Sequence, residues 1–344
     1  MRIVEVARST PGRIAAAICG LGAVVFILRN IGWHTVGHAI HECAAYFPAV
    51  LALEIMILAC STLSLRALYG DAATRVPPRQ YVRAALVGYA IQGLFPAGRA
   101  AAEAARATML AKWVGAGRAG AAAARMQAVV LLANAVISVP AAVATALLGA
   151  PSWLPIAIAA NAAFTAALGV TVLLLGRHVR VGTWLGKRIK RVRSFGADVD
   201  AVLEREPIVP MRAIGWEVAG RCVQVVQHGL LLYCISGVFG LGPSLSAEGI
   251  HLVGAAIGDL IPAQIGAIEG NFTLAASALS LSAASAVSIA LIVHLAQLTW
   301  VIVGLVVPLV WPAAARLLDR ADKREHRVLA VLELERDEPG RGRQ

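Results

Sequence analysis

Two stretches, FPAGRAAAE at residues 95–103 and IPAQIGAIE at residues 261–269, share one skeleton. Each runs proline, alanine, three residues, alanine, one residue and glutamate, so Pro96 and Glu103 correspond to Pro262 and Glu269. Both stretches follow a largely apolar run, and one lies in each half of the chain. The repeat of a helix-breaking proline and a carboxylate in apolar surroundings indicates one structural device used twice.

The composition predicts an all-α integral membrane protein. Of the 344 residues, 58% are hydrophobic and 15% are charged, whereas soluble domains average about 45–50% and about 25%. The mean hydropathy is +0.72, and a spanning helix needs roughly 20 mostly apolar residues. Apolar segments fall near residues 13–30, 48–65, 84–95, 126–150, 152–176, 213–240, 249–262, 264–282 and 285–312.

The distribution of Lys and Arg predicts the orientation, because cytoplasmic loops carry an excess of both. The N-terminus and residues 66–83, 99–125 and 177–193 are basic and are placed inside. Residues 31–47, the turn at 149–155 and the turn at 240–248 lack Lys and Arg and are placed outside. We expect a multi-pass protein of the cell inner membrane with both termini in the cytoplasm.

Parity then predicts two re-entrant hairpins. Residues 84–98 lie between two inside loops, so they are expected to break at Pro96 and return along 99–112. Residues 249–283 are expected to enter and leave from outside, with a break at Pro262. The expected fold therefore has about six transmembrane helices plus two re-entrant helical hairpins in an inverted repeat.

The expected domain organisation follows from these spans. Residues 1–320 form a polytopic membrane domain, with repeat halves of roughly 1–176 and 205–315 joined by a basic cytoplasmic connector at 177–204. Residues 321–344 form a polar cytoplasmic tail. The basic run at 177–193 is interpreted as positive-inside bias with lipid attraction, and nucleic-acid binding is not expected.

The spacing of the cysteines and histidines along the sequence indicates neither a metal site nor a disulfide framework. The five cysteines, at positions 19, 43, 60, 222 and 234, are neither paired nor spaced like metal ligands, so no disulfide framework is predicted. His34, His38 and His41 have helical spacing but lack a convincing further ligand, which favours an interfacial helix. We expect no cofactor.

The paired prolines suggest a site for an anion at mid-membrane. A broken backbone is tolerated in a bilayer only where it lines a cavity or is buried in protein. Proline suits the first turn of a helix, so Pro96 and Pro262 would each open a half-helix with a partly positive N-terminus. Two such ends approaching from opposite faces would favour an anion, and Arg99 offers a guanidinium for a phosphate.

Each candidate side chain also has a simpler interpretation. Arg99 can be a snorkelling residue, and Glu103 and Glu269 can serve only their helix dipoles. A functional carboxylate would carry a proton or act as a gate paired with Arg106, with Asp259 as an additional member. Glu217 and Arg221 have the i, i+4 spacing of an ordinary helix salt bridge and are assigned to each other. The other polar residues within the spans are assigned mostly to interhelical hydrogen bonds: Glu54, Gln224, Gln227, His228, His294 and Gln297.

The two motifs, in the longer forms FPAGRAAAEAAR and GDLIPAQIGAIEGNF, resemble the flippase-like membrane domain of lysylphosphatidylglycerol synthases and their stand-alone relatives. The family's second motif is a proline, a glycine cluster and a glutamate. Pro262, Gly266 and Glu269 match it, while Ala263 and Gln264 stand where glycines are common.

In the first motif of this family, Pro96, Glu103 and Arg106 match, with a longer spacing from proline to glutamate. The resemblance implies movement of an anionic or aminoacylated lipid between leaflets. It also implies that the soluble aminoacyl-transferase domain of the synthases is absent here.

The leading hypothesis is transbilayer translocation of a lipid with an anionic or modified (aminoacylated or glycosylated) headgroup through a central cavity between the hairpins. No catalytic or metal-binding residue is predicted. A homo-oligomer or a lipid-synthesis enzyme is a possible partner. The expected substrate-binding residues are Pro96, Arg99, Glu103, Arg106, Pro262, Gln264, Gly266, Glu269 and Asn271.

Two alternatives stay open. One is a membrane-embedded enzyme that modifies a lipid headgroup, with Glu103 or Glu269 as the base. The other is a proton-coupled transporter of a small anion.

Overall fold

The computed structural model describes residues 41, 43–95, 98–188, 193–237, 239–259, 261–307 and 310. Across these ranges the regular elements are helical and no strand is present. Five of the helices are long and apolar enough to cross a membrane: Phe47–Arg75, Ala116–Leu147, Trp153–His178, Met211–Ser236 and Ala283–Val307. The all-helical multi-pass class is therefore confirmed. The predicted span 13–30 and tail 321–344 lie outside the described residues.

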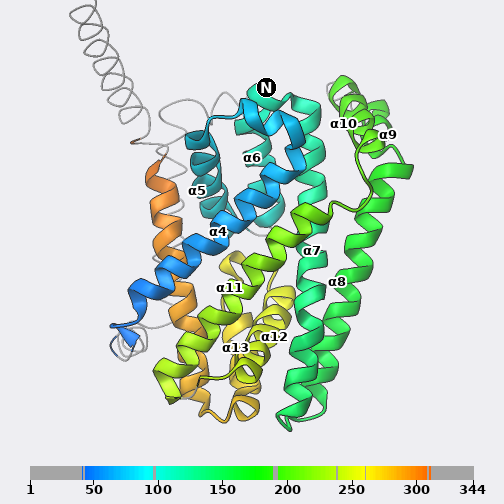
Figure 1. Ribbon diagram of the computed structural model, residues 1–344. Coiled ribbons are helices and arrows are strands. Elements are labelled where there is room, and N and C mark those ends of the chain that lie inside the picture. Colours follow the sequence, from blue (N-terminus) through cyan, green and yellow to red (C-terminus); the bar gives the residue numbers. More distant parts are fainter. Residues whose placement is uncertain are drawn as a thin grey trace, which may run out of the picture.

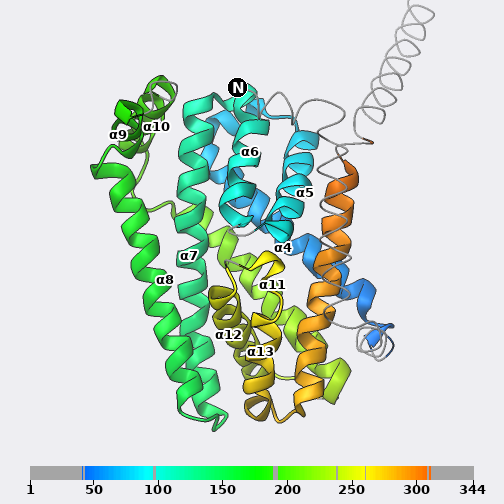
Figure 2. The same ribbon diagram turned by 180° about the vertical axis from the view of Figure 1, so that it is seen from behind.

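Four of these five long helices form two antiparallel pairs. The helices α7 (Ala116–Leu147) and α8 (Trp153–His178) run the height of the molecule side by side (Figures 1 and 2). The helices α4 (Phe47–Tyr69) and α11 (Met211–Ser236) pack together and cross the first pair obliquely. A short 3-10 helix, η1 (Gly70–Arg75), continues α4.

Shorter helices fill the two ends of the molecule. At one end lie α5 (Pro78–Leu94) and α6 (Gly98–Val114), and at the opposite end lie α12 (Leu241–Ile257) and α13 (Ala267–Leu274) (Figures 1 and 2). At 1.5 Å per residue, a helix of 17 residues is about 26 Å long, less than the roughly 30 Å of hydrocarbon. The chain therefore breaks between α5 and α6, and between α12 and α13, inside the molecule.

Two apolar cores leave a polar zone between them along three helices. On α4, Val50 belongs to one core and Leu65 to the other. On α7 the corresponding positions are Ala141 and Met126, and on α11 they are Leu231 and Ala213. The intervening stretch of each helix carries the polar side chains described below.

The break before α13 has an unusual backbone. A 3-10 turn at Pro262–Gln264 is followed by Gly266, and φ is positive at Ala263 (51°), Gln264 (59°) and Gly266 (83°). Left-handed backbone costs a residue with a Cβ about 1–2 kcal/mol. Ala263 and Gln264 stand where glycines are common in the second motif, and both adopt a backbone conformation that favours glycine.

Two predicted boundaries were wrong. Residues 241–248 are the start of α12 rather than a turn, because Pro243 lies in the first helical turn, where its missing N–H breaks no bond. The segment 264–282 is not one helix: α13 ends at Leu274 and a 3-10 helix, η4 (Ala276–Leu279), follows.

The connector between the halves forms a helical hairpin of α9 (Val181–Arg188) and α10 (Arg193–Arg205). The backbones touch at Gly182 and Gly196, where a Cβ on Gly182 would come 2.2 Å from the carbonyl oxygen of Gly196. The carboxylate of Asp200 accepts hydrogen bonds from the N–H groups of Gly182 (3.0 Å) and Thr183 (2.6 Å).

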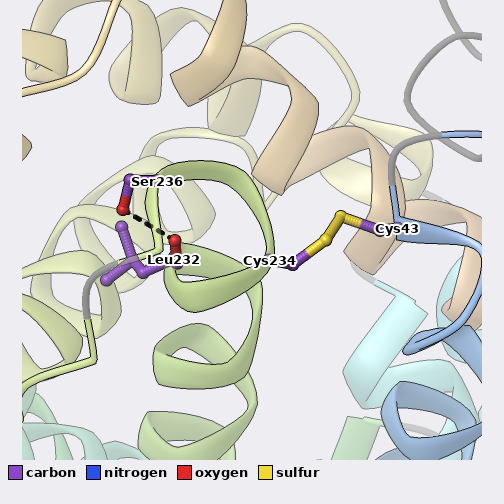
Figure 3. The surroundings of a disulfide bond; sticks show 4 residues. All are labelled: Cys43, Leu232, Cys234 and Ser236. Atoms are coloured by element: carbon purple, nitrogen blue, oxygen red, sulfur yellow. Dashed lines mark hydrogen bonds between the residues drawn. A yellow bond between two sulfur atoms is a disulfide. The ribbon is translucent and has the colours of Figure 1, made fainter.

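A disulfide joins Cys43 to Cys234 across 191 residues of sequence (Figure 3). The expectation of no disulfide was wrong, because this pairing depends on the contact of α4 with α11, which no local spacing reveals. The bond lies beside the last turn of α11, where the Ser236 hydroxyl donates to the carbonyl of Leu232 at 2.8 Å (Figure 3). The described connections at this end, residues 148–152, 239–240 and 280–282, carry no Lys or Arg.

Removing the disulfide is expected to destabilise the fold. The double variant Cys43→Ser/Cys234→Ser should lose about 2–4 kcal/mol of unfolding free energy in detergent, because the cross-link restricts the unfolded chain. Cys222→Ser, which removes an exposed free thiol, is the control and should change little. Alkylation of Cys43 or Cys234 in folded, unreduced protein, read by peptide mass spectrometry, would contradict the bond.

A glycine on α5 makes room for a buried arginine of α6. A Cβ on Gly88 would lie 2.3 Å from Nε of Arg106, whereas a Cβ on Gly215 of α11 meets nothing within 4 Å. Gly88→Ala should therefore cost about 1–3 kcal/mol through overpacking. Gly215→Ala should stabilise by about 0.5–1 kcal/mol through helix propensity. Thermal unfolding of the two variants tests this contrast, and equal shifts would refute it.

Candidate functional site

A cavity of about 450 Å³ lies at the centre of the molecule, within the size range of small-molecule sites. Its wall is built from α4, α5, α6, α7, α8, α11 and α12, together with Gln264 and Gln297. Arg99, Glu103, Arg106 and Gln264 of the predicted site all line it. The other ionisable lining residues are Glu54, Glu217, Arg221, His251 and Asp259.

The two repeated motifs face one space. A smaller cavity of about 80 Å³ is lined by Phe95, Gly98 and Arg99 from the first break and by Asp259, Ile261, Ala263, Gln264 and Ile265 from the second. It shares Tyr89, Gln92, Arg99, Asp259, Gln264 and Gln297 with the central cavity. Residues of the two breaks, far apart in sequence, therefore line one cavity. Pro96 itself lies outside the described residues.

Glu103 and Arg106 form an ion pair on α6. Nη1 of Arg106 lies 2.5 Å from Oε1 of Glu103, and both side chains are almost fully buried. The spacing of three residues puts them on one face of the helix. Because the pair neutralises itself, it contributes polarity to the cavity rather than net charge.

Arg99 is the least engaged cation of the cavity. Within the described ranges, no carboxylate lies within ion-pair distance of its guanidinium. Arg221 of α11 lines the same cavity. Two guanidinium groups, each able to bind phosphate oxygens in a fork geometry, therefore line one cavity.

Arg221 was assigned from its sequence spacing to a bond with Glu217, but its side chain contacts Gln224 and Glu248 instead. Its Nη1 donates to Oε1 of Gln224 at 2.5 Å and lies 3.7 Å from Oε1 of Glu248 on α12. Arg221 therefore connects the cavity wall with a carboxylate behind it.

Glu54 of α4 is a second polar centre of the cavity wall. The hydroxyl of Tyr89 on α5 donates to its Oε1, and Nε2 of Gln227 on α11 donates to its Oε2 at 2.9 Å. The carboxylate is 4% exposed and so links α4, α5 and α11. The sequence analysis assigned Glu54, Glu217 and Arg221 to structural bonds; the signal that could have marked them as site candidates is their charge in mid-span.

The residues of the second motif differ in their positions relative to the two cavities. Glu269 accepts the N–H of Gly266 at 2.8 Å and lies 2.7 Å from Nδ1 of His294, so it fills the N-terminus of its own helix. It does not line the central cavity, although His294 lines the smaller one. Pro262 begins the 3-10 turn, and the buried Asn271 donates to the carbonyl of Ile250, a structural contact.

The ionic lining is mixed rather than simply positive. Arg99, Arg106 and Arg221 face four carboxylates, those of Glu54, Glu103, Glu217 and Asp259. The lining also includes apolar side chains, among them Leu58 of α4, Leu131 of α7 and Phe164 and Leu168 of α8. In the described part of the chain, no group of three or more His, Cys, Asp or Glu residues is arranged to hold a metal ion.

Comparison with protein families gives a match over most of the chain. Residues 13–306 match the model of the family described as lysylphosphatidylglycerol synthase TM region. No curated protein and no solved structure matches the chain. The matched range includes both repeated motifs and every residue that lines the two cavities. The chain therefore belongs to the family of the lysylphosphatidylglycerol synthase membrane region.

Proposed function

We propose that this protein carries the polar headgroup of a membrane lipid from one leaflet to the other through the central cavity. The observation that carries the proposal is the amphipathic wall of this cavity. Arg99 and Arg221 line it beside several carboxylates, and Phe164 and Leu168 of α8 line it as well. A lipid has the same division, because its headgroup needs polar partners while its tails need apolar ones.

The charges favour a headgroup that contains a phosphate and further polar groups. Arg99 and Arg221 suit the phosphate, since guanidinium binds phosphate oxygens in a fork geometry. Glu54, Glu217 and Asp259 suit an ammonium or hydroxyl groups. An aminoacylated or glycosylated phospholipid meets both requirements. An anion without ammonium or hydroxyl groups would instead be repelled by the carboxylates.

The orientation proposal rests on two independent features. The described cations outside the cavity gather at the end of the molecule that holds α9, α10 and the free ends of α5 and α6. The Cys43–Cys234 bond lies near the opposite end, and disulfides persist in oxidising compartments. We therefore place α5 and α6 as a hairpin from the cytoplasm, and α12 and α13 as one from outside.

Thiol labelling of intact cells tests the hairpins. In a background with Cys19, Cys60 and Cys222 replaced by serine and the disulfide kept, Arg79→Cys and Lys112→Cys should both be shielded from an impermeant maleimide. Leu241→Cys and Ala284→Cys should both react from outside. Opposite behaviour within either pair would refute that hairpin, because one of its helices would then span the membrane.

Lipid movement in reconstituted vesicles tests the function. Arg99→Gln and Arg221→Gln should each slow the transbilayer movement of fluorescent phosphatidylglycerol about 10–100-fold, since a hydrogen bond to a charged group contributes about 1.5–3 kcal/mol. Arg75→Gln, a change of an exposed arginine, is the matched control.

Three results would count against this function: movement at the wild-type rate in both cavity variants, no movement with the wild-type protein, or conversion of the lipid to a new product. Conversion of the lipid would favour the alternative function, a membrane-embedded enzyme that modifies a lipid headgroup.

A further inference from the structure

A second buried polar cluster lies behind the cavity wall, on α11 and α12. Glu248 and His228 are both 0% exposed, and Oε2 of Glu248 lies 3.1 Å from Nδ1 of His228. The only other ionic partner of Glu248 among the described residues is Arg221, at 3.7 Å. None of these contacts has hydrogen-bond geometry, so both carboxylate oxygens and both ring nitrogens are buried without a hydrogen bond.

The cluster is connected to the cavity by aromatic and imidazole rings. The ring of His228 lies between Phe272 and His251, with centroids 6.0 Å and 5.3 Å away. His251 lines the cavity, and its Nε2 lies 3.1 Å from Nε2 of Gln224. Titratable groups therefore lead from the cavity surface at His251, through His228, to Glu248.

The surrounding elements supply few other charges. Glu54 of α4 and His294 of the last helix act on the two histidines from a distance, and Glu269 of α13 is engaged by His294. The described part of α8 up to Gly176 has no ionisable residue, and neither has α7 beyond Arg125. Among the described residues, Arg221 is therefore the guanidinium that balances a charged Glu248.

From this arrangement we propose that Glu248 and His228 form a proton-binding site that is coupled to the cavity through Arg221. The inference rests on the proposed function, because it uses an anionic headgroup as the competitor for Arg221. When a phosphate draws the guanidinium of Arg221 toward the cavity, Glu248 loses its cation. A buried carboxylate without a partner takes up a proton rather than remain charged.

The proton is shared between the carboxyl oxygen of Glu248 and Nδ1 of His228, and it enters from the cavity by way of His251. No bond other than those to the proton is made or broken. Coupling is reciprocal, so a protonated cluster also binds the anionic headgroup more tightly. Lipid movement thereby becomes linked to the movement of a proton.

Counting protons on ligand binding tests the inference. Purified protein in micelles is titrated with dioctanoyl phosphatidylglycerol by calorimetry, in several buffers of different ionisation heat. The phosphodiester of this lipid does not titrate near neutral pH, so any proton taken up is bound by the protein. The wild-type protein should take up close to one proton per bound lipid, and Glu248→Gln should bind the lipid without proton uptake.

His228→Gln provides a second variant in case Glu248→Gln does not fold, and it should likewise lower the proton count. Glu204→Gln removes a surface carboxylate of α10 that is paired with Arg180, and this variant should take up the wild-type number of protons. Lipid binding by the wild-type protein without proton uptake, or an unchanged count in Glu248→Gln, overturns the proton site alone. Absence of lipid binding by the wild-type protein overturns the proposed function as well.

Discussion

The structure depends on the cost of placing polar groups inside hydrocarbon. Every such group needs a partner from the protein, so the polar stretches of α4, α7 and α11 face one another between two apolar cores. Glu54 illustrates the rule, because it reaches Tyr89 and Gln227 on two other helices. The cavity is thus lined by polar side chains from several helices, because exposing them to lipid would be costly.

The fold class and the location of the breaks were predictable from the sequence, since both depend on local properties. A long apolar run predicts a span, and proline at 96 or 262 predicts an interrupted helix. Pairings between distant residues were not predictable. The Cys43–Cys234 bond and the contact of Glu269 with His294 are set by helix packing, to which spacing along one helix gives no access.

The same distinction explains the site. Arg99, Glu103 and Arg106 were predicted because they follow the first proline within a few residues. Arg221 was assigned to Glu217 by the rule for neighbours on one helix, but its contacts are with Gln224 and with Glu248 on α12. A spacing rule ranks partners on a single helix, whereas in a bundle a partner on the adjacent helix can lie equally close.

A repeat in sequence does not make the two halves chemically equivalent. Three residues after Glu103 comes Arg106, its ion-pair partner, whereas three residues after Glu269 comes the buried Phe272. Likewise Arg99 corresponds in position to Ile265. Without a cation of its own turn, Glu269 binds the N–H of Gly266 and His294. The first hairpin therefore contributes two of the three arginines that line the cavity, Arg99 and Arg106, whereas the lining residues of the second, which include His251, Asp259 and Gln264, contain no Lys or Arg.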